Sequence, residues 1–210
     1  VVCGPGEQLG SLLVADPRAA MVTFTGSLDV GRSIREQAGL KRVTLELGSN
    51  SAVVVEDADQ LEQVAARCTR GGYSYAGQVC ISVQRVYVKE DLYRPFLDLF
   101  RARVAALRIG PPEDETTHLS AMITPAATAR ALQILGEAKE GGARCELGGR
   151  TDGRVLLPTI VTHASDDMRI CQEELFAPIT VVSPYRDFAE ALARVNNSRY
   201  GLQAGVFTRN

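Results

Sequence analysis

Two residues of this 210-residue sequence combine a reactive side chain with a setting that supports chemistry, Cys80 and Glu46. Cys80 lies in residues 72–82, between a helical pattern and an alternating run that predicts a strand over residues 83–88. A cysteine in such a Gly-containing connection can be held rigidly and still be open to a small substrate. A single free cysteine is more often a small buried hydrophobic residue. The assignment of Cys80 as a nucleophile therefore depends on a second group.

Glu46 supplies that second group. It lies between Leu45 and Leu47 in a short apolar strand that ends at Gly48. A carboxylate flanked by apolar residues is expected to lose hydration and to hold its proton more tightly, which suits a general base or acid near neutral pH. For one Glu in isolation, an exposed strand position is a reasonable alternative. Two unusual residues in separate connections, both near Gly, favour a site.

Four sequence segments carry a resemblance to a known family. The segment LELGSN at residues 45–50, which contains Glu46, is followed by GQVC, which ends at Cys80, then by QEELFAPI at residues 172–179, and finally by YGL at residues 200–202. In this order, over nearly the whole chain, they resemble the signatures of the aldehyde dehydrogenase superfamily. The resemblance implies that Cys80 is the nucleophile and that Glu46 is the general base.

The resemblance also implies a nicotinamide cofactor, NAD or NADP. The turn that contains Gly26, Ser27 and Gly31 precedes a helix expected to run to about Ala38. Ser27 is a suitable N-cap, which explains its presence structurally. The free N–H groups of such a turn can also bind phosphate. This turn resembles the family segment that lies against the cofactor's pyrophosphate, and the three residues match it directly.

Three further residues are cofactor-binding by resemblance, namely Leu47, Glu174 and Phe176. Glu174 matches a carboxylate that accepts ribose hydroxyl groups, and Phe176 matches an aromatic residue near the nicotinamide ribose. Glu173, the residue before Glu174, is interpreted as a structural residue. Cys171 matches no motif and is interpreted as packing.

Composition excludes several function classes. The net charge of −2 and the apolar fraction of 45% indicate a protein with an ample core and no nucleic-acid or membrane-surface signal. No apolar run is long enough to span a bilayer and no secretory signal is visible. The five cysteines are an odd number without metal-ligand spacing, so we expect no metal site and a reducing, cytoplasmic setting.

Strand and helix patterns alternate along the chain, which predicts an α/β fold with a mostly parallel sheet flanked by helices, as in an aldehyde dehydrogenase catalytic domain. We assign residues 1–44 to the C-terminal part of a nucleotide-binding domain and residues 45–210 to a truncated catalytic domain. The first residue, Val1, is not Met, so a piece of a longer protein is expected. Asp57 or Asp59 is expected to cap the helix that leads toward Cys80.

The expected function is oxidation of an aldehyde to a carboxylic acid, with hydride transfer to NAD or NADP through a cysteine thiohemiacetal and thioester. Two alternatives remain, a CoA-acylating aldehyde dehydrogenase and a non-catalytic structural or interaction module. The expected partner is a small aldehyde, and the resemblance implies a homo-oligomer. Two positions depart from the family pattern, because Ser49 and Ala177 each replace a usual Gly.

Overall fold

The computed structural model describes residues 1–209, and the chain divides into two compact units, Val1–Gly48 and Ser49–Asn210. The first unit contains α1 (Gly6–Ala15), β1 (Met21–Thr25), α2 (Leu28–Gln37) and β2 (Arg42–Glu46). The two strands pair in parallel, with Met21 opposite Arg42 and Thr25 opposite Glu46. The whole of β2 belongs to this unit. The assignment of residues 1–44 to a nucleotide-binding domain stays a prediction.

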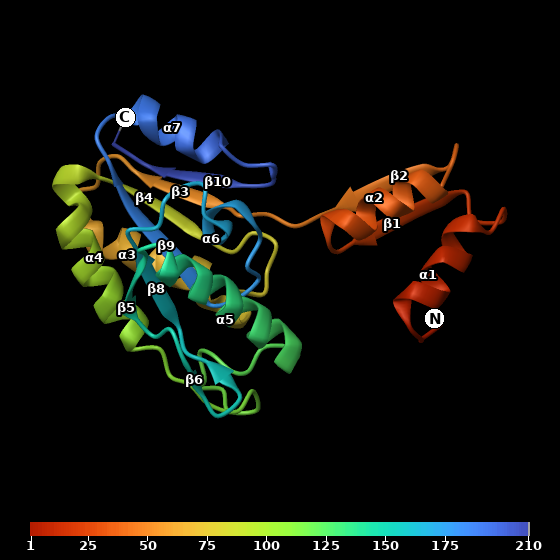
Figure 1. The fold of residues 1–210 in the computed structure, drawn as a ribbon, viewed down its shortest axis with the longest axis horizontal. Helices are drawn as coiled ribbons and strands as arrows, with labels where there is room; N and C mark the ends of the chain where they lie inside the picture. Colours follow the sequence, from red (N-terminus) through yellow and green to blue (C-terminus); the bar gives the residue numbers. More distant parts are fainter. Residues whose placement is uncertain (210) are drawn as a thin grey trace. The chain divides into compact units, whose positions relative to one another are not determined.

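The second unit is built on a six-stranded sheet (Figure 1). Its elements are β3 (Ala52–Val55), α3 (Leu61–Tyr73), the 3₁₀ turn η1 (Ser74–Gly77), β4 (Arg85–Lys89), α4 (Glu90–Ala105), α5 (Pro125–Glu140), β5 (Arg144–Leu147), β6 (Thr151–Asp152), β7 (Val155–Leu156), β8 (Thr159–Thr162), α6 (Arg169–Gln172), β9 (Ile179–Tyr185), α7 (Phe188–Asn196) and β10 (Ala204–Phe207). The strand order is β10-β3-β4-β9-β8-β5, and only the β5–β8 pair is antiparallel. The predicted α/β fold with a mostly parallel sheet is confirmed.

Both faces of this sheet are covered. All four residues of β3 are buried, as its continuous β-branched sequence predicts for a strand with helices on each side. Val53 and Val55 belong to the main core with α3 and α4, whereas Ala52 and Val54 pack in a smaller cluster with Ala191 of α7. The alternation of side chains along β3 therefore separates two cores, one on each face.

The aromatic residues of α4 are core residues, as their helical spacing predicts. Phe96 and Phe100 are fully buried and stack with their ring centroids 5.4 Å apart. Phe100 also meets Tyr73 at the end of α3, at 6.1 Å. These contacts fix the end of α3, and the chain leaves that end toward Cys80.

The predicted cap of α3 is wrong. The N-cap residue is Gln60, and its side chain makes no capping bond. The carboxylates of Asp57 and Asp59 bind Arg209 instead, with a distance of 3.0 Å for Asp59. A capping prediction considers only local geometry, whereas an arginine at the far end of the sequence takes both carboxylates here.

Two residues separate β7 from β8. β7 ends at Leu156, and β8 begins at Thr159. Pro158 lies between them, and it has no N–H to donate to a sheet ladder. Thr159 N–H then donates to the carbonyl of Pro178, 2.9 Å away, which starts the pairing with β9.

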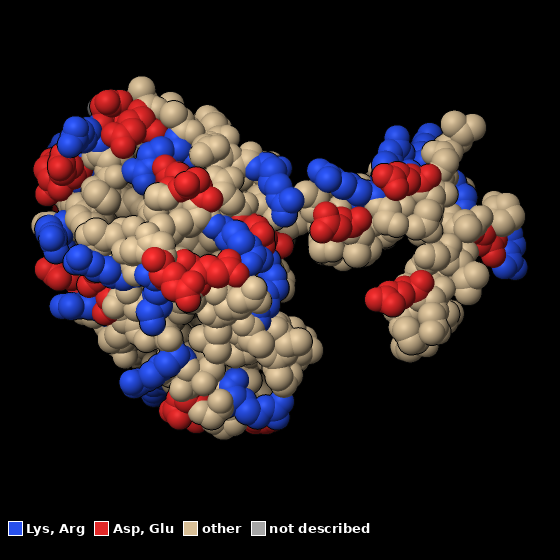
Figure 2. Space-filling model, in the orientation of Figure 1, with Lys and Arg blue, Asp and Glu red and all other residues tan. Residues whose placement is uncertain are grey.

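Charged residues are mixed over the surface of the larger unit. On the face shown in Figure 2, Lys and Arg are interspersed with Asp and Glu, in agreement with the small net charge. Within residues 1–209, none of the helices has the length and apolar character that crossing a membrane requires.

Replacing the central core aromatic residue should destabilise the protein strongly. We expect Phe100→Ala to lower the free energy of unfolding by roughly 3–5 kcal/mol, because it leaves a cavity beside Phe96 and Tyr73. Ile123→Ala is the control, since Ile123 is 79% exposed, and it should change that free energy by less than about 0.5 kcal/mol. Denaturant unfolding measures both. Equal effects of the two changes would contradict this description of the core.

Candidate active site

Cys80 lies in a tight turn between η1 and β4. The N–H of Ser82 donates to the carbonyl of Val79 at 2.9 Å, which closes a four-residue turn around Cys80. The cysteine is half-buried, so its environment is protein on one side and open on the other. Access of a small substrate to Cys80 stays a prediction.

The residues before the turn adopt an unusual backbone conformation. Tyr75, Ala76 and Gly77 have φ angles of 52°, 55° and 69°. The left-handed region costs roughly 1–2 kcal/mol for each residue other than Gly, so surrounding contacts must hold it. Gln78 provides two of them: its Oε1 accepts the N–H of Ile123 at 3.0 Å, and its backbone N–H donates to Tyr75 at 3.1 Å.

The turn packs directly against the segment that carries Glu174 and Phe176. A Cβ on Gly77 would lie 2.1 Å from the carbonyl oxygen of Ala177, so only glycine fits here. Gln84 connects the same two segments after the cysteine, because its Nε2 donates to the Glu173 carbonyl at 2.7 Å and its Oε1 accepts the Leu175 N–H at 3.0 Å. The structure therefore brings Cys80, Glu174 and Phe176 into one region of the larger unit.

The other cysteines differ from Cys80. Cys68 and Cys171 are buried, and burial raises the pKa of each thiol to about 12. Burial also raises the pKa of the Cys145 thiol, and Cys3 is exposed near the start of the chain. The interpretation of Cys171 as a packing residue agrees with its burial.

Glu174 is the half-buried carboxylate of the region. Its Oε1 accepts the N–H of Ser49 at 3.0 Å, and its own N–H donates to the hydroxyl of Tyr200 at 3.3 Å. Burial raises the pKa of the Glu174 carboxyl above its ordinary value, while the Ser49 N–H and the charge of Arg130 oppose part of that rise. Phe176 is 40% exposed at a φ of 51°, so an aromatic ring is held at the surface on a costly backbone conformation.

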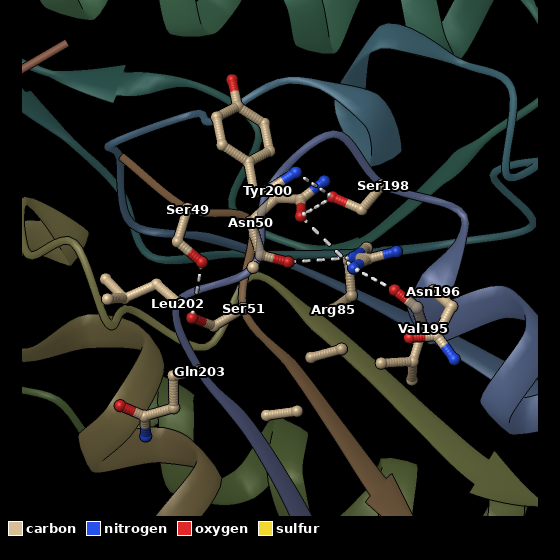
Figure 3. A pocket seen from close by; sticks show the side chains of 13 residues that line it. Ser49, Asn50, Ser51, Arg85, Val195, Asn196, Ser198, Tyr200, Leu202 and Gln203 are labelled. Carbon is tan, nitrogen blue, oxygen red and sulfur yellow. Dashed lines mark hydrogen bonds between the residues drawn. The ribbon is translucent and has the colours of Figure 1, made fainter. Parts of the chain in front are cut away.

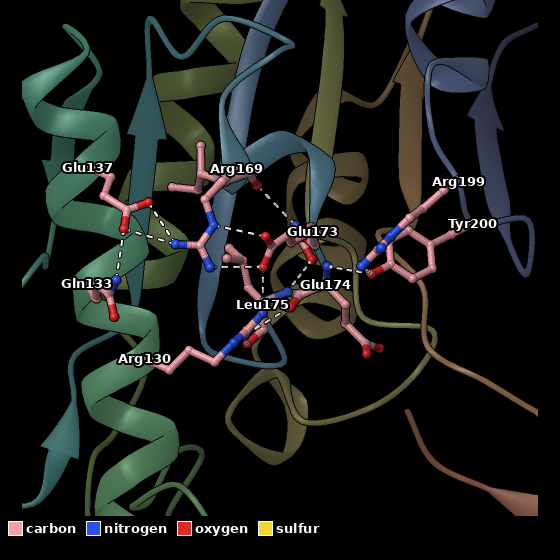
Figure 4. A network of polar contacts seen from close by, with 11 residues as sticks. Arg130, Gln133, Glu137, Arg169, Glu173, Glu174, Leu175, Arg199 and Tyr200 are labelled. Atoms are coloured by element: carbon pink, nitrogen blue, oxygen red, sulfur yellow. Dashed lines mark hydrogen bonds and ion pairs between the residues drawn. The ribbon is translucent and has the colours of Figure 1, made fainter. Parts of the chain in front are cut away.

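Glu173 joins a network of ion pairs beside Glu174 (Figure 4). Its carboxylate binds Arg169 at 2.9 Å and Arg130 at 3.0 Å, and Arg169 also binds Glu137 at 2.9 Å. Arg130 donates to the Glu174 carbonyl at 3.1 Å, which ties α5 to the backbone of the motif. The hydrogen bond from Arg169, together with the charge of Arg130, lowers the pKa of Glu173. A structural role for Glu173 agrees with these contacts.

Glu46 is the last residue of β2, in the smaller unit. Its carbonyl accepts the N–H of Gly26 at 3.0 Å, so it lies next to the Gly-rich turn. The expected loss of hydration is not found, because the side chain is exposed in this chain. The apolar neighbours Leu45 and Leu47 alternate to the other face of the strand, and sequence adjacency therefore does not bury Glu46.

The Gly-rich turn has the local structure that the sequence predicts. The Ser27 hydroxyl accepts the N–H of Val30 at 3.4 Å and caps α2. A Cβ on Gly31 would lie 2.5 Å from the side chain of Leu47, so this glycine lets α2 approach the residue after β2. The unit thus assembles Gly26, Ser27, Gly31 and Leu47 with Glu46, and their cofactor-binding roles stay predictions.

A cavity of about 390 Å³ opens beside Ser49 and Tyr200 (Figure 3). Its polar lining includes Asn50, Ser51, Arg85 and Ser198. The sequence places Asn50 and Tyr200 in quoted motifs but assigns neither a role, and it gives no signal for Arg130. Each acts through partners far away in the sequence, and no local pattern marks such contacts. Within residues 1–209, no group of three or more His, Cys, Asp or Glu side chains is placed to hold a metal ion.

Comparisons of the sequence with known proteins all identify aldehyde dehydrogenases as relatives. The whole chain, residues 1–210, matches the model of the aldehyde dehydrogenase family. The 3-sulfolactaldehyde dehydrogenase of Priestia megaterium is 42% identical over 210 residues, which is 100% of this chain and 44% of that protein. The betaine aldehyde dehydrogenase of Sinorhizobium fredii is 37% identical over 96% of this chain and 43% of its own length. The chain thus spans less than half the length of these relatives.

Solved structures of aldehyde dehydrogenases are similar to this chain over nearly its whole length. Aldehyde dehydrogenase 21 from Physcomitrella patens, in complex with the reaction product succinate, has a TM-score of 0.91 at 35% identity over 97% of this chain and 42% of that chain. Betaine aldehyde dehydrogenase from Staphylococcus aureus, in complex with NAD⁺, has a TM-score of 0.94 at 30% identity over 100% of this chain and 43% of that chain.

Thiol labelling of the native protein tests the described cysteine environments. At about pH 8, the buried thiols with a pKa of about 12 stay protonated, whereas Cys3 is exposed and Cys80 is only half-buried, so a small reagent can reach both. We expect iodoacetamide to modify Cys3 and Cys80 and to spare Cys68 and Cys171, as mapped by peptide mass spectrometry. All four should react after unfolding in guanidinium. Modification of Cys171 before Cys80 in the folded protein would reverse the assignment.

Proposed function

Because the chain belongs to the aldehyde dehydrogenase family, we propose that it supplies the nucleophile of an enzyme that oxidises an aldehyde to a carboxylic acid with NAD or NADP. The observation that carries this proposal is the position of Cys80. It lies half-buried in a turn packed against the segment of Glu174 and Phe176. In our proposal, residues 1–44 belong to the nucleotide-binding domain and residues 45–210 to the catalytic domain.

Glu174 is suited to hold the cofactor. One carboxylate oxygen binds the Ser49 N–H, and the geometry leaves Oε2 to accept the hydroxyl groups of a ribose. Phe176 offers an exposed ring beside it. In the smaller unit, the N–H groups at the start of α2, around Gly26, Ser27 and Gly31, and the contact of Gly31 with Leu47 suit a pyrophosphate group. When bound, the nicotinamide accepts the hydride.

The reaction begins with the Cys80 thiolate, which adds to the carbonyl carbon of the aldehyde and forms a thiohemiacetal. The oxyanion of this adduct receives a hydrogen bond from the backbone N–H of Cys80. Loss of hydride from the former carbonyl carbon converts the adduct to a thioester. Water then adds to the thioester, which releases the carboxylic acid and returns the thiol.

Glu46 is the proton acceptor in this scheme. It takes the thiol proton through a water molecule at the start and later the proton of the hydrolytic water. The Glu46 side chain is exposed at the end of β2, so water can reach its carboxylate. The presence of this base favours hydrolysis over transfer of the acyl group to CoA.

The setting of the enzyme is part of the same proposal. All five cysteines are free thiols, which supports a reducing compartment such as the cytoplasm. We also propose that the intact enzyme is a homo-oligomer, as the family resemblance implies.

Removal of the nucleophile should abolish activity. In the intact protein, Cys80→Ala should reduce NADH formation with an aldehyde to background, because no other thiol lies in the same turn. Cys171→Ala is the matched control and should retain most of the activity, since only a buried sulfur is lost. Steady-state absorbance of NADH measures both. A Cys80→Ala enzyme with substantial turnover would refute the assignment of the nucleophile.

Removal of the base should stop the second half of the reaction. General base catalysis typically contributes roughly a hundredfold to ten-thousandfold, so Glu46→Gln should lower turnover by a factor in that range. Hydride transfer precedes hydrolysis, so an acyl adduct should accumulate on Cys80 and be detectable by intact-mass spectrometry. Glu36→Gln, an exposed carboxylate of α2, is the control and should turn over normally. Parent-rate turnover by Glu46→Gln would reopen the acyl-transfer alternative.

A further inference from the structure

Asn50 is a buried amide at the inner end of the cavity shown in Figure 3. Its side chain is 2% exposed and makes three hydrogen bonds. Nδ2 donates to the carbonyl of Cys171 at 2.9 Å, and Oδ1 accepts the Ser198 hydroxyl at 2.7 Å and an Arg85 Nη2–H at 3.3 Å. Its backbone carbonyl also accepts Arg85 Nε–H at 3.0 Å. One residue therefore contacts three segments that are distant in the sequence.

These bonds require an amide rather than another group of similar size. The Cys171 carbonyl can only accept, so the Asn50 NH₂ must face it, and this fixes the orientation of the amide. The opposite side must accept from Ser198 and Arg85. A carboxylate would place a lone pair against the Cys171 carbonyl, and an apolar side chain would leave buried polar groups without partners.

The segment that contains Asn50 and two of the segments that Asn50 contacts, those of Cys171 and Ser198, also hold Glu174. The residue before Asn50, Ser49, donates its N–H to the Glu174 carboxylate. Cys171 lies in α6, the short helix that leads into Glu174. The Ser198 hydroxyl accepts the N–H of Tyr200 at 3.1 Å, and the Tyr200 hydroxyl accepts the N–H of Glu174. The backbone and the carboxylate of Glu174 are thus both held by groups that Asn50 joins.

Arg85 makes this junction rigid. The arginine is 4% exposed and donates to the carbonyls of Arg194 and Val195 near the C-terminus of α7, at 3.2 and 3.3 Å. That end of a helix carries partial negative charge, which stabilises the buried guanidinium. The nearby carboxylate of Asp166 binds Arg194 instead. Neutral oxygens, including those of Asn50, therefore supply the contacts that the Arg85 charge requires.

We propose that Asn50 is a positioning residue for the cofactor, because it joins the three segments that hold the Glu174 carboxylate in place. The inference rests on the proposed cofactor role of Glu174. Asn50 itself touches no reacting atom; it acts through the Ser49 N–H and the path of the chain into Glu174. Its loss should weaken cofactor binding and leave aldehyde binding unchanged.

The test compares cofactor binding in variants of the intact protein, measured by titration of NADH fluorescence. Asn50→Asp keeps the size of the side chain but turns the donor to Cys171 into an acceptor. One hydrogen bond is worth about two- to tenfold in affinity, so the Kd for NADH should rise by about that factor, with the KM for the aldehyde unchanged. Ser198→Ala removes the bond to Asn50 together with the acceptor of the Tyr200 N–H, so it breaks the same junction and should shift the Kd in the same direction. It decides the question if Asn50→Asp does not fold.

Tyr185→Phe is the control for a merely structural effect. It removes a hydroxyl that donates to the Val55 carbonyl at 3.1 Å, beyond the opposite end of β3 from Asn50. It should lower thermal stability without changing the Kd for NADH. A folded Asn50→Asp protein with reduced stability and an unchanged Kd would overturn the inference. So would an unchanged Kd in Ser198→Ala.

Glu174→Gln separates this inference from the proposed function. If Glu174→Gln leaves the Kd for NADH unchanged, the cofactor role of Glu174 fails, and the inference falls with it. If Glu174→Gln weakens binding and Asn50→Asp does not, only the inference fails. The double variant gives a further criterion, since residues that act through one carboxylate are not additive. Full additivity of the two changes would contradict a role of Asn50 through Glu174.

Discussion

The close approach of two backbones, at Gly77 and Ala177, is the constraint on which the candidate active site depends. A side chain on Gly77 would collide with the Ala177 carbonyl at 2.1 Å, and its φ of 69° is also one that other residues adopt only at a cost. Glycine satisfies both conditions. The turn that presents Cys80 can therefore lie directly on the segment that presents Glu174, so a nucleophile and a carboxylate proposed to bind the cofactor share one region.

Several contacts maintain the unfavourable backbone on both sides of this approach. Tyr75 and Phe176, at positive φ, belong to the two segments that meet there. Gln84 ties the chain after the cysteine to Glu173 and Leu175 through buried hydrogen bonds. A few kcal/mol of local strain is tolerable in such a setting, because the surrounding sheet and core fix the ends of both segments. Conformational strain and the thiol proposed as the nucleophile thus occur together for a physical reason.

Buried polar residues, Asn50 and Arg85 among them, lie beside the apolar core at one end of β3 and β4. Beside the main hydrophobic cluster, Arg85 and Asn50 are almost fully buried, yet no buried side-chain nitrogen or oxygen in the described part of the chain lacks a hydrogen-bond partner. Burying a guanidinium is costly unless all its donors are satisfied. The carbonyls at the end of α7, the backbone and side-chain oxygens of Asn50 and the Tyr87 hydroxyl satisfy them. Asn50 also bonds to the chain that leads into Glu174, through the Cys171 carbonyl. Stability and site geometry here depend on one network.

The sequence by itself determined the fold class, the core aromatic residues of α4, the cap at Ser27 and the family, because these follow from local periodicity, capping chemistry and short motifs. The capping of α3 by Asp57 or Asp59 and the loss of hydration at Glu46 were predicted wrongly. Arg209 binds both carboxylates, and the alternation of β2 turns Glu46 to the exposed face. Only the tertiary structure decided which groups meet across the chain. Arg130 and Glu173 are 43 residues apart, and Ser49 and Glu174 are 125 residues apart. No local pattern encodes such pairs, since they form only when the sheet brings its strand ends together.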